Sequence, residues 1–269
     1  MSEEVEFNAL LDKISRDRAF RCRSYKDKCL RRRIAVRLRA RGIPTYMEYA
    51  HLLDSDPREY DKLLDTLTIN VTKLFRNWES YDALARLVVP ALWSSSASTL
   101  NVWSAGCASG DEAYSLAILF HRHAAATGDG ARAASRVKVL GTDIDVGSLV
   151  AASRGVFPEP AFVDTPPDIR AAYFAAGAPA EAAPAVREMV RFERRDLIQQ
   201  TPPPGQHLIC CRNVVIYFDR ETQEALFERF HDALVPDGYL MLGKVETLFG
   251  AARALFKPVD ARERIFRRA

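Results

Sequence analysis

The chain has 269 residues, of which 48% are apolar and 27% are charged, a composition that allows a substantial hydrophobic core and excludes a disordered chain. No run of about 20 apolar residues is present, which excludes a membrane-spanning helix. The formal net charge at pH 7 is only +3, so the overall charge indicates no particular partner.

The residue types of the first segment and the cysteines indicate the compartment. Glu3, Glu4 and Glu6 stand where a secretory signal would carry basic and then apolar residues, so we expect a cytoplasmic protein without membrane insertion. The five cysteines include no CxxC pair, and Cys210 and Cys211 are adjacent, which fits neither a disulfide framework nor a zinc site. We therefore expect no bound metal.

Residues 1–77 are predicted to form a small helical domain. Apolar residues recur at helical spacing in four successive segments, and Pro57 marks the start of the last of them. These segments are EEVEFNALLDKI, the basic stretch 16–41, PTYMEYAHLLD and PREYDKLLDTLTI.

The basic stretch 16–41 holds twelve Lys or Arg against two Asp, so it carries +10 while the rest of the chain carries −7. Phe20, Leu30, Ile34 and Leu38 recur in it at helical intervals, which predicts one or two amphipathic helices with a basic outer face. A solvated face is the plainer interpretation. The scarcity of compensating acids favours a polyanionic partner, which is an acidic protein helix, a nucleic acid or a lipid surface.

Residues 78–269 are predicted to form an α/β domain. A helix runs from Tyr81 to Pro90, and short apolar strands then alternate with helices. The alternating segments are NVWSAG, DEAYSLAILFHRHAAA, RVKVLGTDID, HLICCRN, ETQEALFERFHDAL and DGYLMLGKVE. This alternation predicts a doubly wound, mostly parallel sheet with helices on both faces, whose ligands bind at the carboxyl ends of the strands. The final PVDARERIFRR predicts a turn between two short strands that add an antiparallel edge.

One stretch between the second and third predicted strands interrupts this alternation. Its AAGAPAEAAPA core is rich in Ala and Pro, which favours a mobile loop over a packed element. The following AVREMVRFERRD is compatible with a short hairpin.

The first strand end carries small residues and two acids. In NVWSAGCASGDE, Gly106 and Gly110 allow a ligand to approach the backbone, and Asp111 and Glu112 open the next helix. Neither GxxxxGK[ST] nor GxGxxG is present, and two carboxylates would repel a phosphate. The pattern favours a ligand with an ammonium group or hydroxyls, although acids at a helix start also stabilise the helix itself.

The second strand ends in Asp143, with Asp145 two residues on. An acid here commonly binds a ribose diol in doubly wound folds, and helix capping is the alternative. Acids at both strand ends without a phosphate cradle predict a nucleoside with a zwitterionic tail, and S-adenosylmethionine fits that description.

Two further segments place polar residues near these strand ends. Arg212, Asn213 and Tyr217 follow the third strand in CCRNVVIYFDR. Asn70, Thr72 and Arg76 lie in INVTKLFRNW, where the helical domain joins the sheet domain. Ligand sites favour such junctions. The alternative is that these residues are a core tyrosine, helix caps and a surface arginine, which would give the same sequence pattern.

Together these segments resemble the chemotaxis receptor methyltransferases of the CheR family. The resemblance covers most of the chain and rests on NVTKLFRN, VWSAGCASGDEAYSLAI, GTDIDVGSLVAASRGVF, FERRDL, CRNVVIYFDRETQEALFERF and LVPDGYLMLGKVETL. It implies a helical N-terminal domain, a class I S-adenosylmethionine-dependent methyltransferase domain and a small antiparallel subdomain around residues 170–195. It also implies methyl transfer to glutamate side chains of chemoreceptors, with S-adenosylhomocysteine as the product.

The resemblance implies roles for individual residues. Those that would contact the cofactor are Asn70, Thr72, Arg76, Glu112, Asp143, Asp196, Leu197, Arg212 and Asn213. Arg76 and Tyr217 would flank the reacting methyl group. The residues that would face the acidic methylation helices of a receptor are Arg31, Arg32, Arg33 and Arg37.

Three positions depart from the family pattern. The family's Asn in the FERRDL segment is Asp196 here, and an ionised carboxylate only accepts hydrogen bonds. The family's Gly-His-Ser-Glu is GKVE, which puts Lys244 in place of the histidine. The loop that grips a receptor's C-terminal peptide in some members is the Ala- and Pro-rich AAGAPAEAAPA, so the resemblance leaves open whether such a tether is used.

The reaction would need no general base, because a glutamate with a pKa near 4.3 is already ionised at neutral pH. Two alternatives keep the cofactor: a non-catalytic sensor that docks on a receptor, and an RNA methyltransferase. The absence of an NPPY-like motif counts against RNA, and the absence of a helix-turn-helix signature counts against DNA binding. We expect a monomer that binds no nucleic acid.

Overall fold

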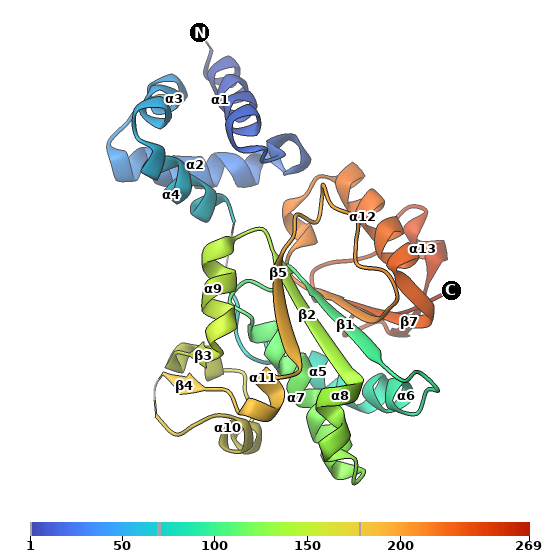
Figure 1. The fold of residues 1–269 in the computed structure, drawn as a ribbon. Helices are drawn as coiled ribbons and strands as arrows, with labels where there is room; N and C mark the ends of the chain where they lie inside the picture. Colours follow the sequence, from blue (N-terminus) through green and yellow to red (C-terminus); the bar gives the residue numbers. More distant parts are fainter. Residues whose placement is uncertain (1, 69–70, 178) are drawn as a thin grey trace. The chain divides into compact units, whose positions relative to one another are not determined.

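The computed structural model describes residues 2–68, 71–177 and 179–269 (Figure 1). The chain divides into two compact units. The helical unit comprises residues 1–69 with Tyr217–Gln223, and the sheet unit comprises the remainder. The division therefore falls at 69–70, before the predicted boundary at 77, because Leu74 and Phe75 are bonded within the sheet unit through Ala161 and Ser115.

The four helices expected in the N-terminal segment are present. They are α1 (Glu3–Arg18), α2 (Asp27–Arg41), α3 (Tyr46–Ser55) and α4 (Pro57–Leu67), with a short 3₁₀ helix η1 (Cys22–Ser24) before α2. Side chains cap three of them: Ser2 accepts from Val5, Thr45 from Glu48, and Asp56 from Arg58. Gly42, with φ +66°, ends α2 in the left-handed conformation that glycine adopts without strain.

The helical unit has its own apolar core. The predicted positions Phe20, Leu30, Ile34 and Leu38 are all buried. Helix α1 packs against α3, and α4 packs against α2 and α3, and the residues buried in these helices include Phe7, Leu10, Tyr49 and Leu63. Burial of this stripe, rather than helix propensity, holds such short helices together.

In the part of the chain that the structure describes, the sheet unit is built on a seven-stranded sheet of order β5-β2-β1-β6-β7-β9-β8. The strands are β1 (Leu100–Ala105), β2 (Val137–Asp143), β5 (Val190–Arg194), β6 (Gln206–Cys211), β7 (Leu234–Leu242), β8 (Phe256–Asp260) and β9 (Ile265–Arg268). The first five pair in parallel, and β8 and β9 add the predicted antiparallel edge. The predicted α/β fold is confirmed.

Helices and short 3₁₀ turns connect these strands. The elements outside the insertion are α5 (Trp78–Leu87), α6 (Val89–Trp93), α7 (Asp111–Ala126), η2 (Gly130–Arg132), α8 (Ala133–Arg136), α9 (Val146–Arg154), η4 (Val215–Tyr217), α12 (Arg220–Ala233) and α13 (Ala252–Leu255). The central helix α7 packs against β1, β2 and β5, and all of its first ten residues are buried. In Figure 1, β5, β2 and β1 run side by side, which is their order in the sheet.

The insertion between β2 and β5 differs from the prediction. It contains β3 (Val156–Phe157), η3 (Glu159–Phe162), α10 (Pro167–Tyr173), β4 (Ala180–Glu181) and α11 (Pro184–Arg187), with β3 and β4 antiparallel. The small antiparallel sheet therefore begins before residue 170. The hairpin considered for AVREMVRFERRD is absent, because α11 is followed by β5, which joins the main sheet as a parallel strand.

Only part of the Ala- and Pro-rich stretch is packed, since Ala175, Ala176, Gly177, Pro184 and Ala185 are exposed. Ala180 and Ala182 are each 1% exposed, and Val186 is fully buried. Edge-to-face contacts among Phe157, Phe162 and Phe174 form the aromatic core of the insertion. The two buried alanines belong to the same apolar core as these rings, whereas the mobility expected for the exposed part of the stretch stays a prediction.

Across the residues that the structure describes, no helix combines the length and apolar character needed to cross a bilayer. The parallel strands β1, β2 and β6 are neighbours, so Ala105, Asp143 and Cys211 end at the same edge of the sheet. The loops that follow these three strands meet there.

Candidate functional site

The loop after β1 has an unusual backbone. Gly106, Ala108 and Gly110 all have positive φ angles, of +83°, +46° and +90°. A Cβ atom on Gly106 would lie 2.5 Å from a methyl carbon of Val214, in the loop after β6. Glycine is therefore required at position 106, where the two strand-end loops approach each other.

Asp143 ties the loops after β1 and β2 together. Its Oδ2 accepts the backbone N–H of Ala108 at 2.9 Å, and its Oδ1 accepts that of Asp145 at 3.0 Å. Burial raises the pKa of Asp143, and these backbone hydrogen bonds oppose the rise. Each carboxylate oxygen has a second lone pair, so Asp143 holds the loop and can still accept a ligand hydroxyl.

Glu112 is a buried carboxylate at the start of α7. The Ser104 hydroxyl donates to its Oε1 at 2.7 Å. Burial raises the pKa of Glu112 to about 7, although Arg212, Ser104 and Arg76 all lower it. Near neutral pH this group therefore exists in both protonation states, and a bound cation would favour the carboxylate.

Arg212 is a buried cation after β6, only 6% exposed. Its guanidinium lies 5.0 Å from the ring centroid of Tyr81, and its Nη2 is 3.4 Å from the Asn77 Oδ1. Its Nε is buried without a hydrogen-bond partner among the described residues, as is the Oδ1 of Asn213. Buried polar atoms usually have partners, so these two indicate a place for a polar ligand.

The segment that carries Thr72 and Arg76 is held in an irregular shape. Phe75 and Asn77 have φ angles of +53° and +59°, which cost energy in residues other than glycine. The Phe75 N–H donates to the Ser115 hydroxyl at 2.8 Å, which fastens the segment to α7. Arg76 Nη1 donates to the Val71 carbonyl at 2.9 Å.

The predicted site residues of this segment are Asn70, Thr72 and Arg76, and the structure describes two of them. Thr72 and Arg76 are both half-buried. Asn70, also predicted to contact a cofactor, lies outside the described residues.

Glu246, the last residue of the GKVE segment, is a buried carboxylate to which the sequence analysis assigned no role. Its carboxylate is 3% exposed and accepts four backbone N–H groups. Oε2 accepts from Gly243 at 2.6 Å and Asn213 at 2.9 Å, and Oε1 accepts from Val214 at 2.9 Å and Ile216 at 3.4 Å. Burial raises the pKa of Glu246, and these four donors oppose the rise. Glu246 thus fixes the loop that leads from Arg212 to Tyr217.

Lys244 and Asp196, which depart from the family pattern, both have partners in the structure. Lys244 forms ion pairs with Glu79 at 3.2 Å and Glu263 at 3.5 Å, so it extends outward from the turn that Glu246 organises. Asp196 Oδ1 accepts the backbone N–H groups of Ile198 at 2.7 Å and Gln199 at 3.2 Å.

Hydrogen bonds from one side chain to backbone carbonyls fix the loop after β5. Arg229, another residue that the sequence analysis missed, donates to the carbonyls of Leu197 at 2.9 Å and Ile198 at 3.0 Å. Leu197 is 8% exposed. The long Arg229 side chain therefore fixes the positions of Asp196 and Leu197.

Tyr217 belongs to the helical unit. Its ring lies under the guanidinium of Arg33, with 4.4 Å between the guanidinium carbon and the ring centroid. Its carbonyl accepts the Lys26 N–H at 2.9 Å.

Two of the four arginines expected to face a partner are instead packed inside the helical unit. Arg33 is 5% exposed. Arg37 forms a two-point ion pair with Glu59, with Nε–Oε1 and Nη2–Oε2 distances of 2.9 Å, and Glu59 is fully buried. Burial makes such a pair costly to break. The prediction that Arg33 and Arg37 face outward is corrected on these contacts.

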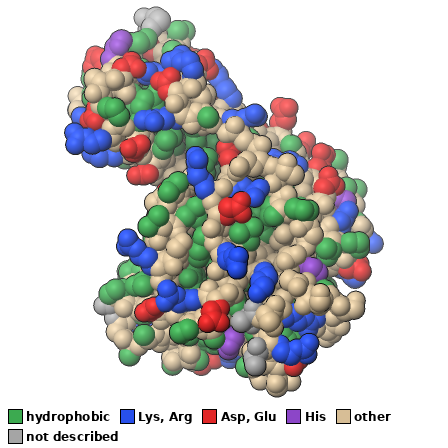
Figure 2. Space-filling model, in the orientation of Figure 1, with side chains coloured by type: hydrophobic (Ala, Val, Ile, Leu, Met, Phe, Trp, Pro, Cys, Tyr) green, Lys and Arg blue, Asp and Glu red, His purple; other side chains and the backbone are tan. Residues whose placement is uncertain are grey.

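The outward face of α2 is still basic. Arg31 is partly exposed and pairs with Glu4 at 2.6 Å, whereas Arg32 is exposed and has no bonded partner among the described residues. Lys28 and Arg39 are exposed at positions four before and seven after Arg32, so the three residues share one helix face. Figure 2 shows Lys and Arg side chains interspersed with Asp and Glu on the visible surface of the helical unit.

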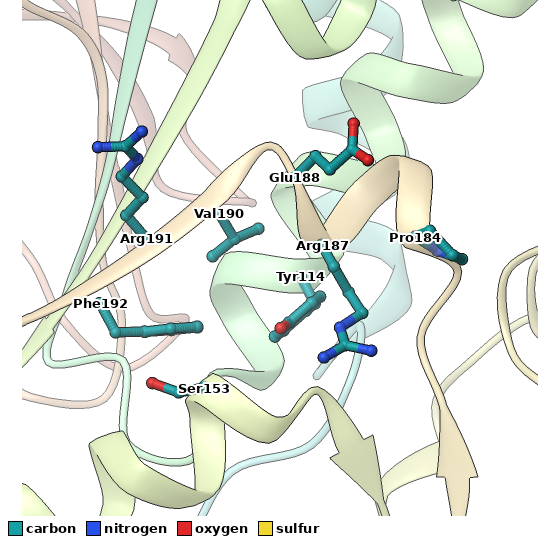
Figure 3. A pocket seen from close by; sticks show the side chains of 8 residues that line it. All are labelled: Tyr114, Ser153, Pro184, Arg187, Glu188, Val190, Arg191 and Phe192. Carbon is teal, nitrogen blue, oxygen red and sulfur yellow. The ribbon is translucent and has the colours of Figure 1, made fainter.

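A cavity of about 590 Å³ lies elsewhere in the sheet unit, beside β5. Its lining includes Tyr114 of α7, Ser153 of α9, Arg187 of α11 and Phe192 of β5. In Figure 3 the side chains of Val190 and Phe192 turn to one side of β5 and Arg191 to the other, as alternation along a strand requires. None of the predicted site residues lines this cavity.

The strand-end loops therefore gather two acids, a buried arginine with an unpartnered N–H, and strained glycine-containing backbone. Carboxylates suit an ammonium group and ribose hydroxyls, and the guanidinium suits a carboxylate. This donor set fits S-adenosylmethionine and does not resemble a phosphate cradle.

Comparisons with known proteins agree with this chemistry. The family model described as CheR methyltransferase, SAM binding domain, matches residues 70–265, and the CheR methyltransferase all-alpha domain matches residues 5–68. A chemotaxis protein methyltransferase of Listeria innocua is 32% identical over 89% of this chain and 88% of its own length. Chemotaxis protein methyltransferase 2 of Pseudomonas aeruginosa is 32% identical over 82% of this chain and 78% of its own length.

A longer relative also matches. An uncharacterized 104.1 kDa protein of Rhodobacter capsulatus is 35% identical over 90% of this chain. The chain spans only 25% of that protein.

Proposed function

Because the chain belongs to the CheR methyltransferase family, we propose that it transfers a methyl group from S-adenosylmethionine to glutamate side chains of chemoreceptors. The chain is an S-adenosylmethionine-dependent methyltransferase of chemotaxis, as the sequence predicted. The observation that carries the proposal is the cluster of Glu112 and Arg212, both buried, with an Arg212 N–H that has no partner among the described residues. On this proposal the protein works in the cytoplasm, beside the methylation helices of receptors.

The residues at the strand ends would hold the cofactor. The Glu112 carboxylate would accept the ammonium group of the methionine part, which requires its ionised form. The free lone pairs of Asp143 would accept ribose hydroxyls. Thr72, Asp196, Leu197, Arg212 and Asn213 would complete the contacts, and we extend the same proposal to Asn70.

When bound, S-adenosylmethionine supplies an electrophilic methyl group on a sulfonium, and displacement by a glutamate carboxylate yields a methyl ester and S-adenosylhomocysteine. The acceptor carboxylate is ionised at neutral pH, so the chain needs no general base. The task of the protein is therefore to align the reacting groups, and alignment can supply much of the rate. We assign this task to the Arg76 guanidinium, which binds a carboxylate, and to the Tyr217 hydroxyl, which orients the reacting groups.

The outward face of α2 is the proposed contact for the acidic methylation helices. Lys28, Arg32 and Arg39 are exposed along it. Positive charge on one helix face steers an acidic partner and raises the association rate, more strongly at low salt. Arg31 can join them, since its pairing with Glu4 is exposed and exchangeable.

A methyl-transfer assay tests the proposal. The protein is incubated with S-adenosylmethionine carrying a labelled methyl group and a receptor cytoplasmic fragment, and base-labile methanol reports carboxyl esters. We expect methanol release that disappears when the receptor glutamates are replaced by alanine. Tight binding of S-adenosylhomocysteine without any release would contradict the proposed reaction.

Variants assign the roles within that assay. Arg76→Ala and Tyr217→Phe are each expected to lower kcat by at least about tenfold, as loss of an aligned polar group does in other enzymes. The matched control is Arg86→Ala, because Arg86 is exposed on α5 and pairs with Asp82 at 2.8 Å in its local helix turn. Full turnover in both site variants would remove Arg76 and Tyr217 from the mechanism.

A further inference from the structure

The backbone of Tyr217 is paired with the helical unit. The Lys26 N–H donates to the Tyr217 carbonyl at 2.9 Å, and the Asp219 N–H donates to the Ser24 carbonyl at 3.0 Å. Between these bonds, Tyr25 and Phe218 form an antiparallel bridge, and their rings lie 5.0 Å apart in an edge-to-face arrangement. The main chain at Tyr217 is thus fixed by the residues that immediately precede α2.

The side chain of Tyr217 is held by α2 itself. The Arg33 guanidinium carbon lies 4.4 Å from the centroid of the Tyr217 ring, well within the range of a cation–π contact. Arg33 Nη1 also donates to the carbonyl of Leu67, at the end of α4. One guanidinium therefore links the Tyr217 ring to two helices of the unit.

The burial of the Arg33 guanidinium lowers the stability of the helical unit instead of raising it. It is 5% exposed, and its Nε and Nη2 are buried without hydrogen-bond partners among the described residues. Burial also lowers its pKa. An apolar side chain of similar length would fill this space without desolvating a cation, so the packing of α2 does not require an arginine here.

The other arginines that stack on rings in this unit differ from Arg33. Arg31 lies 3.7 Å from the Phe7 ring centroid, but it is partly exposed and pairs with Glu4. Arg18 lies 4.6 Å from the Tyr60 centroid and is exposed. Among these three arginines only Arg33 is buried, and its charge is compensated by the Tyr217 ring and the Leu67 carbonyl.

We propose that Arg33 is a positioning residue for methyl transfer, which holds the Tyr217 ring in the orientation that the reaction needs. This inference rests on the proposed role of Tyr217. On this view α2 has two functions on opposite faces: its outward arginines meet the receptor, and its buried Arg33 orients the tyrosine.

The first test measures kinetics in three variants. Arg33→Met removes the charge and keeps the length, Arg33→Lys keeps a cation, and Arg58→Met is the matched control because Arg58 is highly exposed in the same unit. We expect Arg33→Met to lower kcat by about tenfold, since small misplacements of a reacting group are costly. The KM for the receptor fragment and the Kd for S-adenosylhomocysteine should stay unchanged, and Arg33→Lys should restore most of kcat.

A double-mutant cycle separates positioning from a general effect on structure. In a Tyr217→Ala background the ring is absent, so Arg33→Met should lower kcat no further. The same loss in both backgrounds would show that Arg33 acts independently of Tyr217 and would overturn the inference. A rise in KM at unchanged kcat would also overturn it, because Arg33 would then serve receptor docking.

A spectroscopic readout tests the contact without turnover. With 3-fluorotyrosine at position 217, the fluorine signal should shift in Arg33→Met and stay in place in Arg58→Met. An unmoved signal in Arg33→Met would refute the positioning of the ring by Arg33. If wild-type protein releases no methanol but the signal shifts, the proposed function fails while the contact stands, so the two failures are distinguishable.

Discussion

Glu112 and Glu246 are two buried carboxylates of the sheet unit that the fold uses in different ways. Glu246 accepts four backbone N–H groups, so its own chain satisfies both oxygens. Glu112 accepts one side-chain hydroxyl, from Ser104, in the part of the chain that the structure describes. A carboxylate that the backbone satisfies organises the fold, whereas one left with spare acceptor capacity is suited to bind a cation.

The largest expected effect comes from removing the satisfied carboxylate. Glu246→Ala leaves buried N–H groups of Asn213, Val214 and Gly243 without an acceptor, so we expect a loss of about 3 kcal/mol or more in the free energy of unfolding. Urea denaturation measures this loss. Glu228→Ala, at an exposed position on α12, is the control and should stay within about 0.5 kcal/mol of wild type. A similar small change in Glu246→Ala would show that water replaces the carboxylate.

The next effect tests the other carboxylate through ligand binding. Glu112→Gln keeps the shape but cannot become an anion, and we expect the Kd for S-adenosylmethionine to rise by about 10- to 100-fold, the size of a lost charge-assisted contact. Calorimetry with Glu228→Gln as the control measures this change. The free energy of unfolding at pH 8 should not fall, because the amide spares the cost of a buried charge. Unchanged affinity would reassign Glu112 to a structural role.

The pH dependence sharpens the comparison. Burial raises the pKa of Glu112 to about 7, so the carboxyl is mostly neutral at pH 6. We expect the Kd for the cofactor to be up to about tenfold weaker at pH 6 than at pH 8, with the dependence absent in Glu112→Gln. Calorimetry at successive pH values measures this. A flat profile in wild-type protein would contradict the assignment.

The same shift has a consequence for stability without cofactor. Because the pKa of Glu112 is higher in the folded state than its usual 4.5, the folded protein binds this proton more tightly than the unfolded chain. The resulting stabilisation is complete below about pH 4.5 and is lost as the pH rises through 7. Thermal unfolding of wild type and Glu112→Gln across this range should diverge accordingly.

The smallest expected effect concerns Lys244, two residues before Glu246. Its partner Glu79 is exposed, and its second partner, the buried Glu263, keeps the Ser80 hydroxyl as a donor, so Lys244→Ala should lower the free energy of unfolding by much less than Glu246→Ala does. Urea denaturation beside Glu246→Ala compares the two positions. A loss as large as that of Glu246→Ala would mean that the whole turn, rather than its carboxylate, determines stability.

The fold was largely predictable because its signals are periodic. Apolar spacing predicted the helices, and the alternation of strands and helices predicted the parallel sheet. The same spacing already indicated the positions of Arg33 and Arg37, since each lies three residues after an apolar residue of the buried stripe, Leu30 and Ile34. The outward placement of Arg33 and Arg37 followed the family resemblance and did not use this spacing.

The rest of the candidate site depended on contacts that sequence does not encode locally. Glu246 and Arg229 act on backbone groups about 30 residues away in the sequence, and the GKVE segment that contains Glu246 does not indicate which groups its carboxylate accepts. The acids at the strand ends were predictable because parallel topology brings those ends together. Whether such an acid holds a loop or binds a ligand could not be predicted. For Asp143 only the hydrogen bonds of the structure show that it holds the loop.

The assignment of Tyr217–Gln223 to the helical unit affects how the protein is made. On the ribosome, residues 1–69 emerge first, but the segment that pairs with Ser24, Tyr25 and Lys26 is synthesised some 150 residues later, after roughly 8–30 s at 5–20 residues per second. Through that interval the Tyr25 ring of the nascent chain lacks the Phe218 ring that it packs against in the folded protein. A single cut between residues 69 and 70 likewise yields no complete helical module, so this unit cannot be transplanted as one contiguous cassette.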